Sequence, residues 1–242
     1  HLYLKGRSFW HRRYEGFLQK AMECFEQAIQ KDPHFALAYT GLADTYGSLG
    51  VWGWSPPSKV FPKAAALVQK ALEIDDKLAE AHASQAMVNM FYDWEWASAG
   101  SRLERAISLN PGCAPIHLWN GHYLSIVGRF DEAIAEVRKA QDLDPLSPIV
   151  SANVGWTFIL AADQNRAVDE LHGVLEIDPH NATARFYLGL SYAELGRFDA
   201  AIEMFQEARQ TTGGMPWSAE SIGWVYALAG KPGKAKSILY ES

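Results

Sequence analysis

ATARFYLGLSYAELGRFDAAIEMFQEA, the stretch from Ala182 to Ala208, decides the fold of this chain. In its first half Leu188 and Tyr192 lie four residues apart and predict one face of a helix, within which Gly189 lets a neighbouring backbone come close. A Gly-Arg-Phe turn follows, and the second half predicts another helix. The inner stripe of that second helix alternates small and large side chains: Ala201, Phe205 and Ala208. Two such antiparallel helices cannot bury their apolar faces alone, so they must stack on copies of themselves.

Copies of the pattern recur along the whole chain. Three prolines close successive second helices at steps of 34 residues: Pro111, Pro145 and Pro179. Counting from these prolines predicts seven helical hairpins in one elongated domain over residues 1–242. Their approximate bounds are 1–34, 35–78, 79–113, 114–147, 148–181, 182–215 and 216–242. We therefore expect fourteen helices and no strands.

The order Leu-Gly-x-x-Tyr, Gly-Arg-Phe and Ala-x-x-x-Phe-x-x-Ala resembles the tetratricopeptide repeat, a family with a period of about 34 residues. The resemblance implies an all-α fold, namely a right-handed superhelical solenoid of about seven helix-turn-helix repeats. The third hairpin departs from the family pattern, because Gln85 and Asn89 stand where Leu and Tyr are expected.

Two further segments, FYDWEW at residues 91–96 and DLDPLS at residues 142–147, resemble the C-terminal repeat region of bacterial multidomain regulators. In that group the repeats follow a winged-helix DNA-binding domain or a signalling kinase or nucleotide cyclase domain. The chain starts at His1 rather than at a methionine and stops at Ser242 within an expected helix. We therefore expect it to be part of a longer protein.

Composition excludes several classes of partner. A net charge of −6 and a pI near 5.8 give no general attraction to nucleic acid or to an anionic membrane surface. The sequence contains no run of 18 apolar residues and no secretory signal at its start, so we expect no membrane contact. Cys24 and Cys113 fall in different repeats, which indicates free thiols and a reducing, cytoplasmic environment.

Residue patterns that carry chemistry were sought along the chain. The segment 230–234 has the glycines and lysines of a phosphate-binding loop without their spacing. His117 and His122 lie about 140° apart around one helix, so they do not share a metal. Asp93 and Glu95 could be paired carboxylates, but their place in a turn indicates a solvated edge. We assign no catalytic residue, no metal site and no cofactor, and expect a protein that is not an enzyme.

The family resemblance implies that the first helix of each repeat lines a concave, partner-binding groove. Aromatic and polar side chains occupy the matching positions: Trp119, His122, Asn153, Trp156, Tyr187 and Trp224. We expect a protein or peptide partner there, or an upstream domain of the same chain, and no direct binding of nucleic acid. One alternative is that these rings pack between helices. Another is that the groove binds a small ligand and controls an attached DNA-binding or catalytic domain.

Two turns are rich in tryptophan, the loop Trp52–Trp54 and the turn Trp94–Trp96. Turns between paired helices lie on one edge of a solenoid, so we predict that at least one Trp of each turn buries against the other. The alternative is an exposed aromatic patch, which would mark a partner site.

The start of the chain carries four cations beside Trp10: Lys5, Arg7, Arg12 and Arg13. We expect them to be solvated at a domain junction. Contact with an upstream domain or nucleic acid is the alternative.

Overall fold

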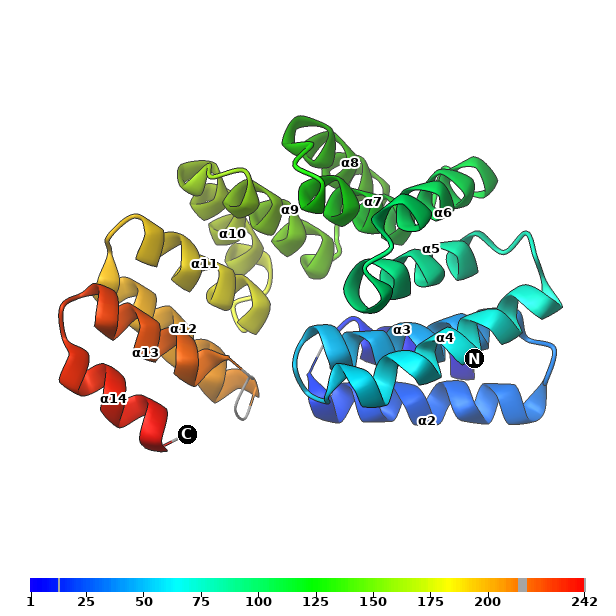
Figure 1. Cartoon of the computed structure of the whole chain (residues 1–242), viewed down its shortest axis with the longest axis horizontal. Helices are drawn as coiled ribbons and strands as arrows, with labels where there is room; N and C mark the ends of the chain where they lie inside the picture. Colours follow the sequence, from blue (N-terminus) through cyan, green and yellow to red (C-terminus); the bar gives the residue numbers. More distant parts are fainter. Residues whose placement is uncertain (13, 213–216, 242) are drawn as a thin grey trace. The chain divides into compact units, whose positions relative to one another are not determined.

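A computed structural model describes residues 1–12, 14–212 and 217–241 of the chain (Figure 1). Within these ranges it contains fourteen α-helices, one π-helix and no strand, which confirms the all-α prediction. The first helices of the hairpins are α1 (Leu2–Trp10), α3 (Ala36–Val51), α5 (Ala79–Val88), α7 (Ala114–Ile126), α9 (Pro148–Leu160), α11 (Ala182–Glu194) and α13 (Ser218–Leu228). The second helices are α2 (Glu15–Lys31), α4 (Pro57–Ile74), α6 (Trp96–Leu109), α8 (Phe130–Leu143), α10 (Gln164–Ile177), α12 (Phe198–Thr212) and α14 (Pro232–Glu241).

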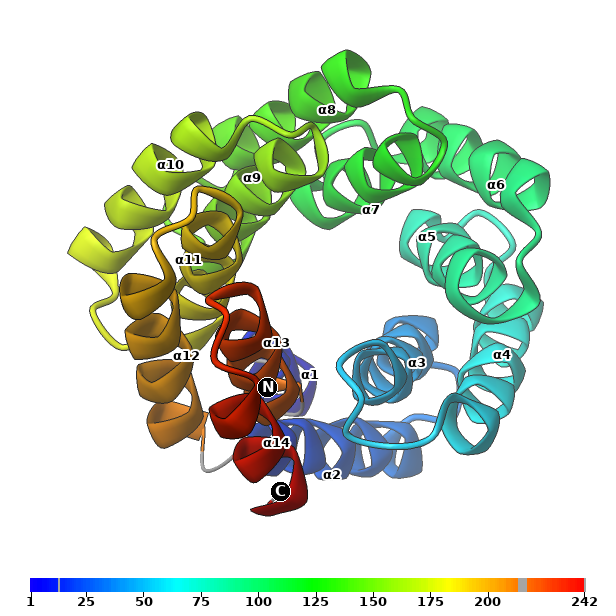
Figure 2. The same cartoon turned by 60° about the vertical axis from the view of Figure 1, so that its left-hand side comes forward.

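The chain divides into two compact units, His1–Tyr123 and Leu124–Ser242, which are described separately below. Within each unit, Figure 1 and Figure 2 show the two helices of a hairpin lying side by side. In the first unit α3 packs against α4 and α5, and in the second α11 packs against α12 and α9. A helix therefore contacts its hairpin partner and its neighbours in the chain. In the part of the chain that the structure describes, no helix is both long and apolar enough to cross a membrane.

Packing within the units places large side chains of a second helix against glycines of first helices. Phe25 of α2 is fully buried, and a Cβ added at Gly6 of α1 or Gly41 of α3 would lie 2.7 or 2.5 Å from its ring. The same ring thus joins the first hairpin to the second. In the second unit, Leu171 of α10 packs in this way against Gly155 of α9, 2.6 Å from the position of the missing Cβ. This knob-and-hole packing is tight because protein interiors are filled to crystal-like density.

The register predicted for the third hairpin is wrong by one residue. Ala86 and Met90, not Gln85 and Asn89, stand whole 34-residue steps before Leu188 and Tyr192 of the opening stretch. Both are buried in the core between α5 and α6. Gln85 is only half-buried, and Asn89 begins the π-helix η1 (Asn89–Asp93) that follows α5.

Met87 is the true departure of this hairpin from the repeat pattern. It stands one and two steps before Gly121 and Gly155, where a glycine is expected. Its buried side chain points back to the preceding hairpin, and a Cβ added at Gly47 of α3 would lie 2.3 Å from its Cε and Sδ atoms. A flexible thioether thus fills a gap between successive first helices.

The predicted reciprocal burial of tryptophans from the two turns is wrong. Trp54 packs against the core of α1 to α5, but Trp94 and Trp96 are 71% and 42% exposed. Tyr92 instead reaches the fourth helix, where it stacks on Phe61 with ring centroids 5.4 Å apart and planes 10° apart. The physical reason is local: η1 lengthens the turn, and a left-handed residue at Trp94 directs the chain away from the first turn.

Candidate functional site

In the second unit, two of the predicted groove residues form an aromatic pair. Trp156 of α9 and Tyr187 of α11 stack with ring centroids 4.9 Å apart and planes 21° apart. Tyr187 is 6% exposed, whereas Trp156 is only half-buried. The pair therefore bridges the first helices of successive hairpins and leaves part of the indole at the surface. Such a stack contributes about 0.5–1.5 kcal/mol beyond its buried area.

The other two groove residues of this unit differ in exposure. Asn153 is 5% exposed, and its side-chain amide donates to the carbonyl of Ile149 at 2.7 Å within the same helix. This donor therefore supports α9. Trp224 of α13 is 38% exposed and offers a large apolar surface.

The remaining groove residues, Trp119 and His122, lie on α7 in the first unit. Their rings are 5.5 Å apart, and Trp119 also makes an edge contact with Phe91 at 6.2 Å. Trp119 packs against both apolar cores of this unit. Packing between helices, the alternative considered from the sequence, thus describes much of its surface.

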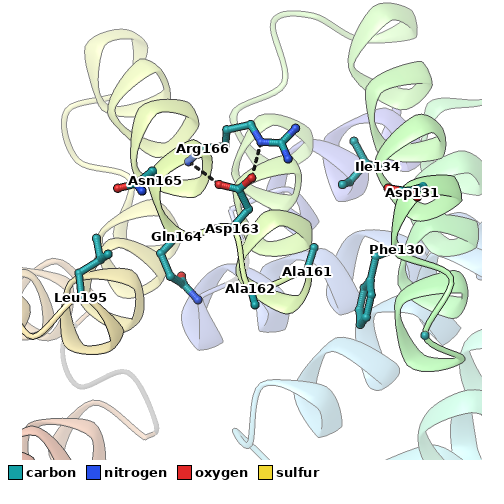
Figure 3. A pocket seen from close by; sticks show the side chains of 11 residues that line it. Phe130, Asp131, Ile134, Ala161, Ala162, Asp163, Gln164, Asn165, Arg166 and Leu195 are labelled. Atoms are coloured by element: carbon teal, nitrogen blue, oxygen red, sulfur yellow. Dashed lines mark hydrogen bonds and ion pairs between the residues drawn. The ribbon is translucent and has the colours of Figure 1, made fainter.

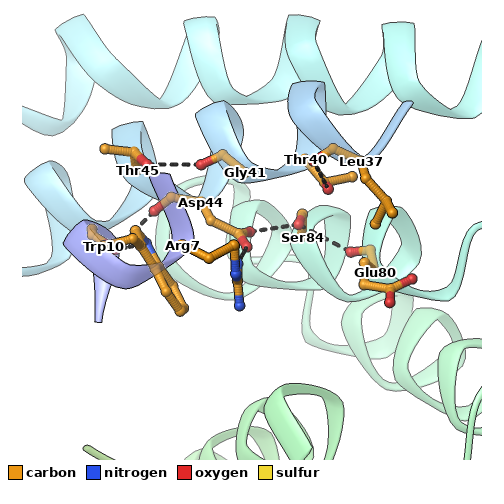
Figure 4. Close-up of polar contacts among 10 residues, drawn as sticks. Arg7, Trp10, Leu37, Thr40, Gly41, Asp44, Thr45, Glu80 and Ser84 are labelled. Carbon is orange, nitrogen blue, oxygen red and sulfur yellow. Dashed lines mark hydrogen bonds and ion pairs between the residues drawn. The ribbon is translucent and has the colours of Figure 1, made fainter. Parts of the chain in front are cut away.

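A polar network that sequence reasoning missed joins three first helices of the first unit (Figure 4). Arg7 of α1 donates from Nη1 to Asp44 Oδ2 at 3.1 Å, and Ser84 of α5 donates from Oγ to Asp44 Oδ1 at 2.5 Å. The Arg7 and Asp44 side chains are 19% and 10% exposed. A signal was present, since Asp44 is the one charged residue among the 16 of α3. A buried carboxylate requires a partner, and the partner comes from a different hairpin.

The network extends to Trp10 and corrects the expectation of solvated cations at the start of the chain. The Arg7 guanidinium lies 4.2 Å from the centroid of the Trp10 ring, and the Trp10 indole N–H donates to Ser48 Oγ at 3.0 Å. The expectation is therefore wrong for Arg7. Two other cations lie over aromatic rings, Lys5 over Phe9 at 5.8 Å and Arg12 over Phe17 at 4.6 Å. Arg13 is outside the described residues.

A polar groove of about 580 Å³ lies along α5 and α6. Its wall includes His82, whose Nε2 is 3.0 Å from the carbonyl oxygen of Asp76 and whose Nδ1 is 3.3 Å from Nη1 of Arg102. Because the carbonyl can only accept, Nε2 carries the proton and Nδ1 accepts from the guanidinium. Further along the groove, Ser98, Ser101 and Arg105 are exposed.

A second cavity, of about 560 Å³, lies at the turns between paired helices of the second unit (Figure 3). Its charged residues are largely paired. The Asp163 carboxylate accepts from the backbone N–H of Arg166 at 3.1 Å and from its guanidinium at 2.5 Å, and these bonds lower the pKa of Asp163. Asp163 thus caps the start of α10.

The thiols of the chain are not activated. Burial raises the pKa of Cys113 to about 11, and burial also raises the pKa of Cys24. Both are therefore protonated near neutral pH and are poor nucleophiles. Among the residues that the structure describes, no group of three or more His, Cys, Asp or Glu side chains could hold a metal.

Comparisons with known proteins agree with the helical hairpins. Residues 162–216 match the family model described as tetratricopeptide repeat. Tetratricopeptide repeat protein 13 of Homo sapiens is 28% identical over 124 residues, covering 51% of this chain and 14% of that protein. Transcriptional regulator HilA of Salmonella typhimurium is 25% identical over 155 residues, covering 64% of this chain and 28% of that protein. This chain therefore spans only a minor part of the length of these relatives.

A solved structure, the anaphase-promoting complex hetero-tetramer Cut9–Hcn1, matches with a TM-score of 0.82 and 14% identity. The match covers 99% of this chain and 45% of that chain. At this level of identity the likeness shows the fold alone.

Proposed function

We propose, from the premise that this chain is built of tetratricopeptide repeats, that it binds a peptide segment of a partner protein on the first helices of its hairpins. The observation that carries the proposal is the Trp156–Tyr187 stack, which leaves part of one indole open on α9. Tryptophan and tyrosine supply large contact areas at low side-chain entropy and are enriched among residues that dominate binding energy. Trp119, His122, Asn153 and Trp224 are the other residues that we assign to these faces.

The bound segment is proposed to be apolar and extended rather than acidic. The cation of the first-helix network, Arg7, is already paired with Asp44 and lies over Trp10. Few charges remain to pair with an acidic tail, so binding should depend only weakly on salt. We infer a non-enzymatic role, which the protonated thiols and the internally paired charges support.

The proposed context is a larger bacterial regulator, in which the repeats receive an upstream domain or a separate partner. The match to part of a protein named a transcriptional regulator supports this context. The reading frame upstream of His1 tests it. We expect a winged-helix, kinase or cyclase domain there, and a frame without one would contradict the proposal.

Selection from a random peptide phage library on the purified chain tests the binding proposal. The selected peptides are then titrated calorimetrically. Trp156→Ala should weaken binding by about 2 kcal/mol, roughly thirtyfold in Kd, with helical circular dichroism retained. Leu146→Ala is the matched control, because Leu146 is 81% exposed in a turn between hairpins of the same unit. Peptides that bind both variants equally well would exclude the Trp156 surface.

A small-ligand sensor is the second candidate. The groove along α5 and α6 favours it, since about 580 Å³ lies within the usual size range of ligand sites, roughly 300–1,000 Å³. A metabolite library screened by thermal shift tests this candidate. A ligand whose stabilisation is lost in Arg105→Ala would support it, and a screen without such a ligand would leave the peptide proposal preferred.

A further inference from the structure

The turn between α5 and α6 has an unusual and well-defined backbone. The π-helix η1 follows α5, and its first residue, Asn89, accepts from the backbone N–H of both Trp94 and Glu95. Trp94 has φ 61° and ψ 28°, in the left-handed region that bulky residues rarely adopt. Single π-turns occur frequently at functional sites, and left-handed non-glycine residues cluster there. The turn therefore holds its side chains in one fixed arrangement.

The base of the turn is anchored in the first unit. Tyr92 stacks on Phe61 of α4, and the preceding Phe91 packs against both apolar cores and contacts Trp119. Asn89 is 6% exposed, and its side-chain amide donates to Asp93 Oδ2 at 3.1 Å. The surface beyond this base is presented on a rigid support.

Trp94 and Trp96 form that surface. They are 71% and 42% exposed, and their rings lie 6.2 Å apart with planes at 43°. Two neighbouring exposed indoles are costly in water, and tryptophan is the residue most characteristic of binding hot spots. The alternative stated from the sequence, an exposed aromatic patch at this turn, therefore describes the structure.

Charge indicates what this surface accepts. The exposed carboxylates of Asp93 and Glu95 alternate with the two indoles. Among the described residues, no Lys or Arg forms an ion pair with either carboxylate or lies over either indole. The cations facing this region are Arg102 and Arg105, which line the groove beside Glu95; Arg102 contacts His82.

We propose that the segment Tyr92–Trp96 is a docking surface for a partner protein segment that carries a Lys or Arg side chain. The cation lies over an indole face, where the ring quadrupole attracts it, and the carboxylates of Asp93 and Glu95 pair with its N–H groups. The apolar stem of the same side chain covers the rest of the indole surface. This surface is separate from the first-helix faces, so the proposal goes beyond the function proposed above.

Nuclear magnetic resonance of the indole N–H groups tests the proposal on the intact chain. The probe is an acetylated, amidated peptide of Leu-Arg repeats, compared with Leu-Gln and Leu-Glu peptides of the same length. We expect the Trp94 and Trp96 signals, assigned with Trp→Phe variants, to shift with the Leu-Arg peptide alone. The Trp156 signal should stay in place, which separates this surface from the first-helix surface. Absence of these shifts, or equal shifts with the Leu-Gln peptide, would overturn the proposal.

Matched charge variants separate a specific site from general attraction to an acidic chain. Asp93→Asn with Glu95→Gln should weaken binding of the Leu-Arg peptide about tenfold. Glu23→Gln with Glu26→Gln removes the same charge from the exposed face of α2 and should change it less than twofold. An equal loss in both double variants would mean that only net charge attracts the peptide.

Trp94→Gly separates binding from folding. Glycine adopts the left-handed conformation without steric cost, so this variant should keep or raise the urea midpoint of the wild type. It should nevertheless lose at least tenfold in affinity for the Leu-Arg peptide, because the indole is absent. A Trp94→Gly variant that binds as tightly as the wild type would refute the role of this indole.

Discussion

Phe205 occupies the space that a side chain at Gly189 would require. A Cβ added at Gly189 would lie 2.6 Å from Cε1 of the Phe205 ring, and that ring is fully buried. The first helix of this hairpin can approach the second only because it lacks a side chain at that point. The opening glycine and phenylalanine of the repeat pattern are therefore two halves of one contact.

Gly189→Ala should lower the free energy of unfolding by about 1–3 kcal/mol, because a buried ring has no room to move aside. Urea unfolding followed by circular dichroism measures the change. Gly173→Ala is the matched control: nothing lies within 4 Å of a Cβ there, in the interior of α10. Alanine at 173 should raise stability by about 0.5–1 kcal/mol. Changes of the same sign at both positions would contradict the packing described here.

The turn after α9 stores strain at Ala162. Its φ is 59°, and at steps of 34 residues the equivalent positions are glycines with φ of 79°, 73° and 69°: Gly128, Gly196 and Gly230. Ala162→Gly should stabilise the chain by about 0.5–1 kcal/mol, since the left-handed cost for alanine exceeds the extra chain entropy of glycine. Gly196→Ala should lower stability by about 1–2 kcal/mol. Thermal unfolding checks both, and a stabilising Gly196→Ala would be incompatible with this account.

The period of 34 residues was enough to predict the helical hairpins and the contact of Gly189 with Phe205. Small residues and a large ring recur at fixed offsets, so the pattern specifies which faces meet. In the third hairpin the prediction slipped by one residue because Met87 replaces the glycine that marks the register. A methionine that fills a gap in the preceding hairpin carries no local signal of that contact.

The side-chain arrangements that depend on several hairpins were not predictable. The Arg7–Asp44–Ser84 network joins residues about 40 positions apart, and the sequence does not state which hairpin supplies the partner of Asp44. The exposure of Trp94 depends on the π-helix, a local backbone choice without a recognised residue signature. Of the groove residues, only Trp156 and Tyr187 are joined by a ring contact between hairpins; the assignment of all six to binding stays a prediction.

Arg7 and Asp44 should show strong energetic coupling. Arg7→Met alone should lower the free energy of unfolding by about 3 kcal/mol, because it leaves a mostly buried carboxylate without its cation. The double variant with Asp44→Leu should lose less than the sum of the two single variants, with a coupling of about 1–3 kcal/mol. A double-mutant cycle in urea measures it. The cycle for Arg129 and Glu132, whose side chains are 54% and 58% exposed, is the control and should give a much smaller coupling. Similar couplings for the two pairs would show that burial does not govern the first.

Stability should fall at alkaline pH through Cys113. Burial raises the pKa of this thiol from 9.0 to about 11 in the folded chain. As the pH rises through 9, the unfolded chain releases the thiol proton while the folded chain keeps it, so ionisation favours unfolding until about pH 11. The loss should approach about 2 kcal/mol. Burial also raises the pKa of Tyr3, which adds a loss of the same sign above pH 10.0. Cys113→Ala removes only the first contribution, so the difference in unfolding free energy between wild type and variant should shrink from pH 8 to pH 11, as the thiol of the unfolded wild type ionises. Parallel pH profiles would show that Cys113 titrates normally in the folded chain.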